Sequence, residues 1–346
     1  MKIKLLSVLV LLPMLFITSA SFSQATTLTA GDIAVIHVRS DSPDRFAFIT
    51  FVDINAGTGI YFTDCGTTAG GSFTTPCNEG TQKYTVPAGG LSAGDIIQFE
   101  TGLANTNFAS YSDSRIGGSL NLSGNGDQIT VFQDATNAAG GTNAGNNATF
   151  IFITHNSSTV FTGNPTDTNQ SSLPIGLSDV TTPRTALGLG NSAGAEDEID
   201  NVIYSGTYDF SGFATEAQAL AAAKLAFTDP ANYYKTNTNG TGDTTYNNHL
   251  AAIPTGINIT TLSNDEFLSN SFAIYPNPSN GNITIRNSGV ALQNITVTDL
   301  NGRTISSNDM NGVTSNVDVS LKLTTGIYLM KLTSNDASTT KKLIIK

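Results

Sequence analysis

Carboxylates are the most numerous charged side chains in this sequence, with 27 Asp and Glu against 16 Lys and Arg. Asp53 and Asp64 belong to strand-like runs, and Asp127 lies in a turn of Gly and Asn residues. Two carboxylates that face each other across a sugar can hydrolyse a glycosidic bond, so these three acids are candidates for a hydrolase of an environmental polymer. The absence of Trp weakens that interpretation, because sugar rings usually stack on aromatic side chains, although ten Tyr residues could substitute.

Acidic residues also gather in three short loops, which read "SDSPD", "SGNGDQ" and "AEDEID". Their oxygen atoms suit Ca²⁺, which takes six to eight oxygen ligands, but no stretch fits an EF-hand or a glycine-rich calcium repeat. A solvated acidic surface explains the same residues. The sequence therefore favours a protein without a cofactor and leaves a structural calcium ion as the alternative. The candidate ligands are Asp41, Asp44, Asp127, Glu196, Asp197, Glu198 and Asp200.

The three histidines, His37, His155 and His249, are far apart in the sequence and form no metal-binding spacing. The chain contains no GxSxG, SxxK or HExxH motif, so the common nucleophile and zinc signatures are missing. His37 lies in an expected strand, where a structural role is more common than catalysis. We therefore name no catalytic residue. The sequence favours a binding protein over an enzyme and leaves the question open.

The two cysteines, Cys65 and Cys77, enclose the Gly- and Thr-rich loop "CGTTAGGSFTTPC". A metal site would need further ligands, and no His or additional Cys lies nearby. In an oxidising compartment we expect the two thiols to form a disulfide that restrains this loop.

The first residues have the pattern of a secretory signal peptide. Lys2 and Lys4 precede an apolar run over residues 5–17, and small residues follow in "TSASFSQA", which predicts cleavage before Gln24. A membrane anchor is the weaker interpretation, because this run is too short to span comfortably and no other run is long enough. The composition also fits an exported β protein, with 12% charged residues and 33 Gly.

From Gly31 onward, short β-branched and aromatic runs alternate with turns rich in Gly, Asn and Pro. Examples are "IAVIHVRS", "RFAFITFVDI", "DQITVFQD" and "ATFIFITH", which predict an all-β sandwich. Residues 135–147 predict an exposed loop. One Ala-rich helix is expected over residues 215–227, with Thr215 and Gln218 as a capping box and Pro230 after its end. We expect it to cap one end of the sandwich.

The charge distribution divides the chain into two modules. Residues 24–269 carry 7 basic and 23 acidic residues, for a net charge of −16, whereas residues 270–346 carry 7 basic and 4 acidic residues, for +3. Without its signal peptide the chain has a net charge of −13, which disfavours nucleic acid and anionic lipid as partners. We expect a signal peptide over residues 1–23, a β-rich cargo domain over 24–258, a polar linker over 259–269 and a second β domain over 270–346.

The last module combines strand-like runs with turn motifs that contain Pro, Asn and Gly. It contains "YPNPSNG", "TVTDLNGR", "TTGIYLMKL" and the terminal "KKLIIK", and its apolar runs predict about seven strands in a small immunoglobulin-like sandwich. In order, these four elements resemble the type A C-terminal sorting domain of type IX secretion cargo. The residues that carry the resemblance are Tyr275, Pro276, Asn277, Pro278, Gly281, Asp299, Gly302, Arg303, Gly326, Tyr328, Lys341 and Lys342.

That resemblance implies export by the outer-membrane translocon of Bacteroidota-type bacteria. It also implies removal of the domain by a sortase and, often, attachment of the cargo to surface lipopolysaccharide. We therefore expect a secreted or cell-surface protein with no transmembrane segment in its mature chain. Deletion of residues 270–346 should trap it in the periplasm.

Four stretches of residues 24–258 read "GDIAVIHVRSDSPDRFAFITFVDINAGTGIYFTDCG", "NEGTQKYTVPAGGLSAGDIIQF", "GNGDQITVFQ" and "DFSGFATEAQALAAAKLAFTDPANYY". They look similar to a β-rich module of large extracellular bacterial proteins, and this resemblance implies a fold without a particular chemistry. We interpret the cargo domain as a non-enzymatic extracellular binding or adhesion module. An extracellular hydrolase and a structural surface component are the alternatives.

Overall fold

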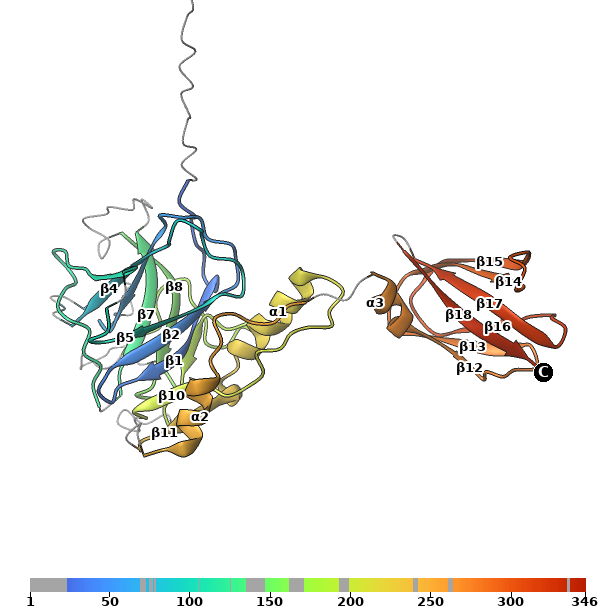
Figure 1. Cartoon of the computed structure of the whole chain (residues 1–346). Coiled ribbons are helices and arrows are strands. Elements are labelled where there is room, and N and C mark those ends of the chain that lie inside the picture. The colour runs from blue at the N-terminus through green and yellow to red at the C-terminus, as the bar shows by residue number, and fades with distance from the viewer. Residues whose placement is uncertain are drawn as a thin grey trace, which may run out of the picture.

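The computed structural model shows two β units (Figure 1). The residues that the structure describes are 24–68, 73–74, 77, 79–104, 106–124, 126–134, 147–161, 171–192, 199–238, 242–260, 264–334 and 337–346. The expected signal peptide and most of the expected loop 135–147 lie outside them. Strands dominate both units, so the all-β prediction is confirmed.

The larger unit consists of eleven strands and two α-helices within the described residues. Its strands are β1 (Ile33–Arg39), β2 (Arg45–Thr50), β3 (Gly59–Thr63), β4 (Thr81–Thr85), β5 (Ile96–Glu100), β6 (Phe108–Ser110), β7 (Gln128–Asp134), β8 (Ala148–His155), β9 (Ala186–Gly188), β10 (Asn201–Tyr204) and β11 (Tyr233–Thr236). They form a five-stranded sheet of order β11-β10-β1-β2-β5 and a six-stranded sheet of order β6-β4-β3-β7-β8-β9.

Aromatic side chains from the two sheets fill the space between them. Phe46 of β2 stacks on Phe62 of β3 with 4.9 Å between the ring centroids, and Phe48 lies 4.7 Å from the same ring. Because side chains alternate along a strand, Ala47 and the arginine at position 45 lie on the opposite face of the five-stranded sheet. One face of this sheet therefore packs in the core, and the other carries the half-buried Arg45 next to buried side chains such as Ala47.

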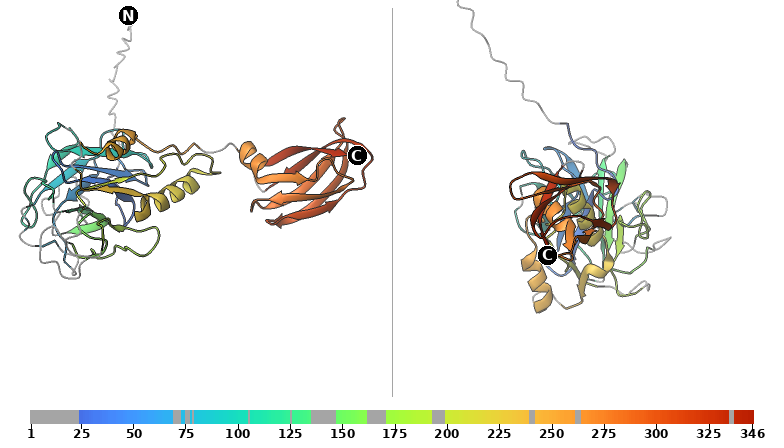
Figure 2. Two further views of the ribbon diagram at one scale, coloured as in Figure 1. Left: turned by 90° about the horizontal axis from the view of Figure 1, so that it is seen from below. Right: turned by 90° about the vertical axis from the view of Figure 1, so that its right-hand side faces the viewer.

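The predicted helix is present as α1 (Glu216–Phe227), and Thr215 caps it by accepting a hydrogen bond from the Gln218 N–H. A 3₁₀ turn, η1 (Pro230–Asn232), follows it. The ring of Phe227 packs 4.1 Å from that of Tyr204 on β10, which fixes the helix against the five-stranded sheet. Figure 2 shows α1 and α2 (Thr244–Ala252) lying on this unit. The sequence analysis missed α2, which Asp243 caps.

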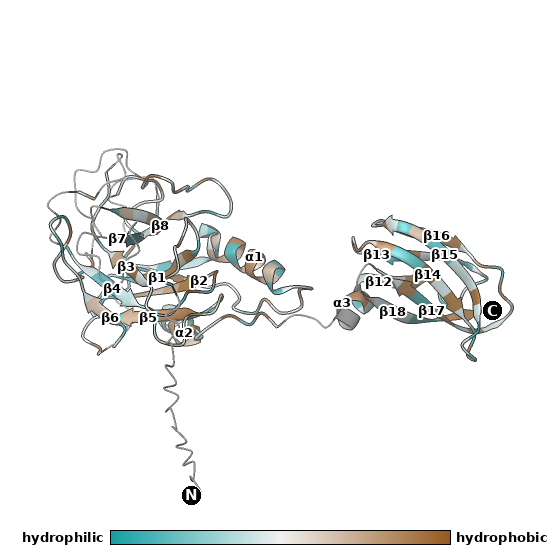
Figure 3. Ribbon diagram, turned by 90° about the horizontal axis from the view of Figure 1, so that it is seen from above, coloured by the Kyte–Doolittle hydropathy of each residue, from teal (hydrophilic) through white to brown (hydrophobic). Residues whose placement is uncertain are grey.

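The smaller unit is a two-sheet sandwich with a helix at one end (Figure 1). The helix is α3 (Asn264–Ser271), and the strands are β12 (Phe272–Tyr275), β13 (Asn282–Asn287), β14 (Leu292–Thr298), β15 (Thr304–Val313), β16 (Val317–Ser320), β17 (Gly326–Thr333) and β18 (Ser338–Ile345). The sheets have the orders β12-β13-β16 and β15-β14-β17-β18. Seven strands match the number expected, and Figure 3 shows hydrophobic and hydrophilic residues alternating along β13.

The expected linker, residues 259–269, divides between the two units. The Thr260 carbonyl accepts a hydrogen bond from the Gly212 N–H, so this residue belongs with the larger unit. Leu268 of α3 is buried in the core of the smaller unit. The helix before β12 is therefore part of the smaller sandwich, and residues 261–263 lie between the parts that the structure describes.

Candidate functional site

The Pro-Asn-Pro segment lies against the last strand of the chain. Pro276 and Pro278 have no backbone N–H and cannot continue a ladder. The side chain of Asn277 instead donates from Nδ2 to the carbonyl of Lys342 at 2.7 Å, and its Oδ1 accepts the N–H of Ile344 at 2.9 Å. Two motifs separated by more than sixty residues in the sequence are therefore in direct contact.

Gly281 allows the chain to turn sharply between β12 and β13. Its φ is +105°, a conformation that L side chains rarely adopt. A Cβ atom at this position would lie 2.5 Å from the carbonyl oxygen of Leu321. The carbonyl of Gly281 also accepts a hydrogen bond from the Leu321 N–H. A glycine is therefore needed at this position for two reasons: it adopts the positive φ of the turn, and it leaves room for the backbone of Leu321.

The "DLNGR" motif closes the hairpin between β14 and β15. Asp299 Oδ1 accepts the N–H of Asn301 at 3.0 Å and that of Arg303 at 2.9 Å, and its Oδ2 pairs with Arg303 Nε at 3.1 Å. The hydrogen bond from the Arg303 N–H lowers the pKa of Asp299. With Gly302 at φ +81°, the motif is a self-contained turn.

The remaining motif residues hold β17 and β18 in place. Gly326 begins β17, and Tyr328 donates its hydroxyl to the Thr324 carbonyl at 2.9 Å. Lys341 donates from Nζ to the carbonyl of Ser269 at 2.6 Å and to its hydroxyl at 2.9 Å. A cation next to the last carbonyls of a helix is favourable, so Lys341 fixes α3 to β18.

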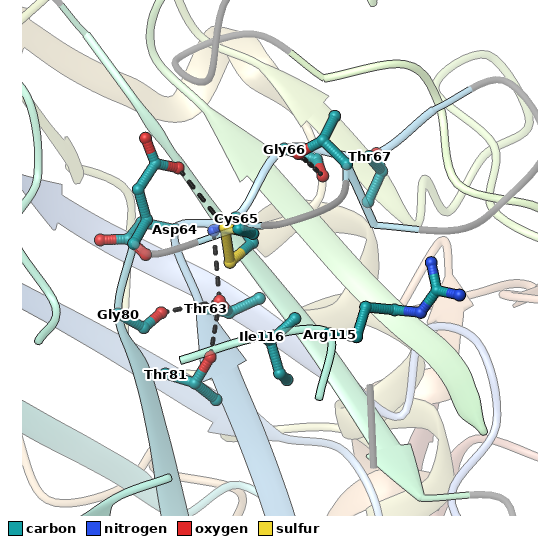
Figure 4. Close-up of a disulfide and its surroundings, with 12 residues drawn as sticks. Thr63, Asp64, Cys65, Gly66, Thr67, Gly80, Thr81, Arg115 and Ile116 are labelled. Carbon is teal, nitrogen blue, oxygen red and sulfur yellow. Dashed lines mark hydrogen bonds between the residues drawn. A yellow bond between two sulfur atoms is a disulfide. The ribbon is translucent and has the colours of Figure 1, made fainter. Parts of the chain in front are cut away.

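In the larger unit, Cys65 and Cys77 form the predicted disulfide. Both residues are buried. Figure 4 shows the hydrogen bonds beside it: the Cys65 N–H and the Thr81 hydroxyl both donate to Thr63 Oγ1, which donates to the carbonyl of Gly80. Cys65 therefore lies just beyond the end of β3, and the disulfide joins it to Cys77, which forms an isolated bridge with Ile116.

The structure brings two of the candidate acids together. Asp64 and Asp127 are 0% and 2% exposed, and the charge of Asp64 contributes to raising the pKa of Asp127 after the main effect of burial. Asp64 Oδ2 accepts the Asn121 N–H at 3.0 Å, whereas Oδ1 is buried without a hydrogen-bond partner. Burial raises the pKa of Asp64 to about 7. Such enclosed carboxyls cannot touch a polymer.

Asp53 stands apart from this pair on the surface, where Oδ1 accepts the Ala93 N–H at 2.9 Å. Among the calcium candidates, Asp44 Oδ2 accepts the Leu122 N–H, and burial raises its pKa. Asp41 Oδ2 accepts from Asn201 Nδ2 at 2.6 Å, and the Asp200 carbonyl accepts the Ser40 N–H. The acids at 196, 197 and 198 lie outside the described residues.

Within the described ranges, no three His, Cys, Asp or Glu side chains gather as a metal site requires. The calcium alternative stays a prediction, because three of its candidate ligands are not among these residues.

The histidines lie in three different environments. His37 Nε2 is 2.6 Å from the Tyr246 hydroxyl, and burial, with the charges of Arg45 and Arg39, lowers the pKa of His37 to about 3. His155 Nδ1 lies 3.0 Å from the Ser157 hydroxyl, and burial lowers its pKa to about 4. Both rings are therefore neutral at ordinary pH. His249 lies on α2.

The outward face of the five-stranded sheet carries a polar row that the sequence analysis missed. The register places Asn201 of β10, Arg39 of β1, Arg45 of β2 and Glu100 of β5 side by side across four strands. Arg45 Nη2 pairs with Glu100 Oε2 at 2.9 Å. The signal was present in "RSDSPDR", because two arginines at equal distance from a tight turn become cross-strand neighbours.

A hollow of about 260 Å³ opens beside this row and is lined by His37, Arg45, Gln98, Phe99, Glu100, Leu103 and Ala104. A second hollow of about 320 Å³ shares Phe99, Glu100, Leu103 and Ala104 with the first. Leu103 lines both hollows and is 64% exposed. Fixed polar groups beside an apolar surface are typical of a small-ligand site.

No helix among the described residues is long and apolar enough to cross a membrane. No curated protein matches the chain significantly. Residues 273–346 match the family described as the secretion system C-terminal sorting domain. The matched range contains the Pro-Asn-Pro segment and all seven strands of the smaller unit, apart from the first residue of β12, Phe272. The protein is therefore a type IX secretion cargo that carries a C-terminal sorting domain and is exported to the cell surface or the medium.

Proposed function

We propose that the larger unit is a non-enzymatic extracellular binding module that recognises one saccharide unit of a polymer at the hollow beside Arg45 and Glu100. The observation that supports it is the combination lining this hollow: a fixed guanidinium–carboxylate pair, the amide of Gln98 and the apolar side chain of Leu103. Hydroxyl groups accept from the guanidinium and donate to the carboxylate, and the apolar face of a sugar ring packs on Leu103.

The size of the hollow fits this assignment. About 260 Å³ lies just below the range of roughly 300–1,000 Å³ that encloses drug-sized ligands. A single sugar of a longer chain is of that size, and the second hollow, with Gln82 and Ser110 in its lining, continues the surface for a neighbouring sugar.

The hydrolase alternative receives less support. Glycoside hydrolysis needs two carboxyl groups on either side of the bond to be cleaved. Asp64 and Asp127 are enclosed and bonded to backbone N–H groups, and Asp53 stands apart from them. The half-buried carboxylate of Glu100 at the hollow is paired with Arg45, and no second carboxyl group is among the described residues that line it.

The test is calorimetric titration of the purified protein with neutral and acidic soluble polysaccharides, with and without Ca²⁺, while released sugar is assayed in parallel. We expect saturable binding without product, weakened about 2- to 10-fold in Gln98→Ala, because the loss of one neutral hydrogen bond costs about 0.5–1.5 kcal/mol. Arg45→Ala should weaken polysaccharide binding more than Gln98→Ala does, because it removes a charged donor. Arg286→Ala, on an exposed position of β13, is the matched control.

Detection of released sugar would contradict the non-enzymatic proposal and would identify the larger unit as a hydrolase. Binding that survives both Gln98→Ala and Arg45→Ala would move the site elsewhere, and no binding to any polysaccharide would contradict a saccharide ligand.

We also propose that a sortase removes the sorting domain after export and that the cargo is left on lipopolysaccharide. The division of the chain into two units between residues 260 and 264 supports cleavage near this point. Mass spectrometry of the surface protein should find a C-terminus between the two cores and, on the attached form, a lipopolysaccharide adduct.

A further inference from the structure

β18 is an edge strand, and the segment that follows β12 forms hydrogen bonds with the outward backbone groups at its end. The four outward backbone groups from the Lys342 carbonyl to the Lys346 N–H all have partners. Asn277 supplies two of them through its side chain, and the backbone of Ser279 supplies the other two. The Ser279 N–H donates to Ile344, and its carbonyl accepts from Lys346, both at 2.9 Å.

The position of Asn277 explains why an asparagine stands between two prolines. A primary amide carries the same donor and acceptor as a peptide group. Flanked by two residues without N–H groups, the Asn277 side chain pairs with β18 in place of the backbone. The segment thus continues the sheet for one more position without a regular strand.

The same outer edge is held further upstream by α3. Lys341 Nζ bonds to Ser269 at the end of this helix, and Leu268 is buried in the core of the sandwich. An uncovered edge strand would expose a row of unpaired backbone groups that pair readily with another chain. Here the Pro-Asn-Pro segment pairs with the last groups of that row, and α3 contacts the strand at Lys341 beside them.

We propose that Asn277 is a positioning residue of the export signal. It holds the end of β18 against the Pro-Asn-Pro segment, so that the secretion machinery binds the two motifs as one folded surface and does not bind them as separate linear sequences. This proposal concerns the sorting domain and is independent of the ligand of the larger unit.

The test compares Asn277→Ala with Asn277→Asp in the full-length chain, produced in a host with type IX secretion. Asp keeps the acceptor for the Ile344 N–H but removes the donor to Lys342. The matched control is Asn280→Ala, since the Asn280 side chain accepts from Asn282 within its own turn. Two quantities are measured for each variant: amide hydrogen exchange at Ile344 and the fraction of the protein that reaches the medium or the cell surface.

We expect Asn277→Ala to lower the protection of Ile344 about 5- to 30-fold, as the loss of one or two hydrogen bonds predicts, and to lower export in parallel. Asn277→Asp should retain more of both, and Asn280→Ala should match the wild type. Near-ultraviolet circular dichroism checks that the sandwich is still folded, and if Ala unfolds it, the comparison rests on Asp.

Three outcomes would overturn the proposal. Faster exchange with unchanged export would mean that the machinery does not depend on this edge. Lower export with unchanged protection would make Asn277 a direct contact of the machinery. Unchanged exchange and unchanged export would mean that Asn277 does not hold the strand.

Discussion

At the residue scale, Asp64 couples folding to pH. Its carboxyl group is 0% exposed, and burial raises its pKa from 3.8 to about 7. Between pH 4 and 7 the unfolded chain therefore loses this proton while the folded chain keeps it. The stabilisation is complete below pH 4 and is lost as pH rises through 7, and the total effect is roughly 4 kcal/mol.

Asp64→Asn should remove this pH dependence, because an amide imitates the protonated acid and can still accept the Asn121 N–H. Between pH 5 and 8 the free energy of unfolding in urea should fall by about 2–3 kcal/mol more in the wild type than in the variant, because about two pH units of that interval lie below the pKa of the folded state. The control is Asp53→Asn, whose exposed side chain accepts one backbone N–H. Equal destabilisation of Asp64→Asn at both pH values would contradict the prediction.

At the element scale, the turn between β12 and β13 depends on Gly281, and Gly289 provides a matched comparison. Both glycines have positive φ, +105° and +98°. A Cβ at Gly281 would lie 2.5 Å from a backbone oxygen, whereas a Cβ at Gly289 would meet nothing within 4 Å. Both substitutions by Ala cost about 1 kcal/mol or more for the strained conformation, and Gly281→Ala adds the clash.

We therefore expect Gly281→Ala to lower the stability of the smaller sandwich by at least about 1 kcal/mol more than Gly289→Ala does. Thermal unfolding of the full-length chain, followed by circular dichroism, measures the difference. Equal losses would show that Leu321 moves away at little cost.

The sequence predicted those elements whose own residues determine them. β1, β2, β7 and β8 follow from apolar and β-branched runs, and α1 follows from its Ala content and its Thr215 cap. It did not predict α2, whose sequence "TTYNNHLAA" has no apolar face and whose single buried side chain is Tyr246. That helix depends on tertiary contacts, including the Tyr246 hydroxyl beside His37.

The same distinction applies to the sites. The disulfide and the sorting domain could be predicted because short motifs carry them. The segment "RSDSPDR" could have predicted that Arg39 and Arg45 are cross-strand neighbours, but the place of Glu100 beside them depends on the register of β2 with β5, which no local pattern shows. Asp64 and Asp127 were predicted as candidate acids, but only the packing of the sheets reveals that both are enclosed.

At the scale of the whole molecule, the chain contains separate hydrophobic cores. The core around Phe46 and Phe62 and the smaller cluster around the disulfide lie in the larger unit, whereas the core around Leu332 lies in the sorting domain. No buried residue is shared between the cores of the two units among the described residues. Each unit should therefore unfold by itself.

Calorimetry of the full-length chain should then show two transitions that respond to different substitutions. Replacing Cys65 and Cys77 by Ser removes a bond across 12 positions, and loops of this length contribute about 3 kcal/mol, so the transition of the larger unit should shift down. Leu332→Ala removes a fully buried side chain from β17, which costs about 2–5 kcal/mol, and should lower the other transition by about 10 °C or more. A single transition that moves with both changes would mean that the two units fold as one.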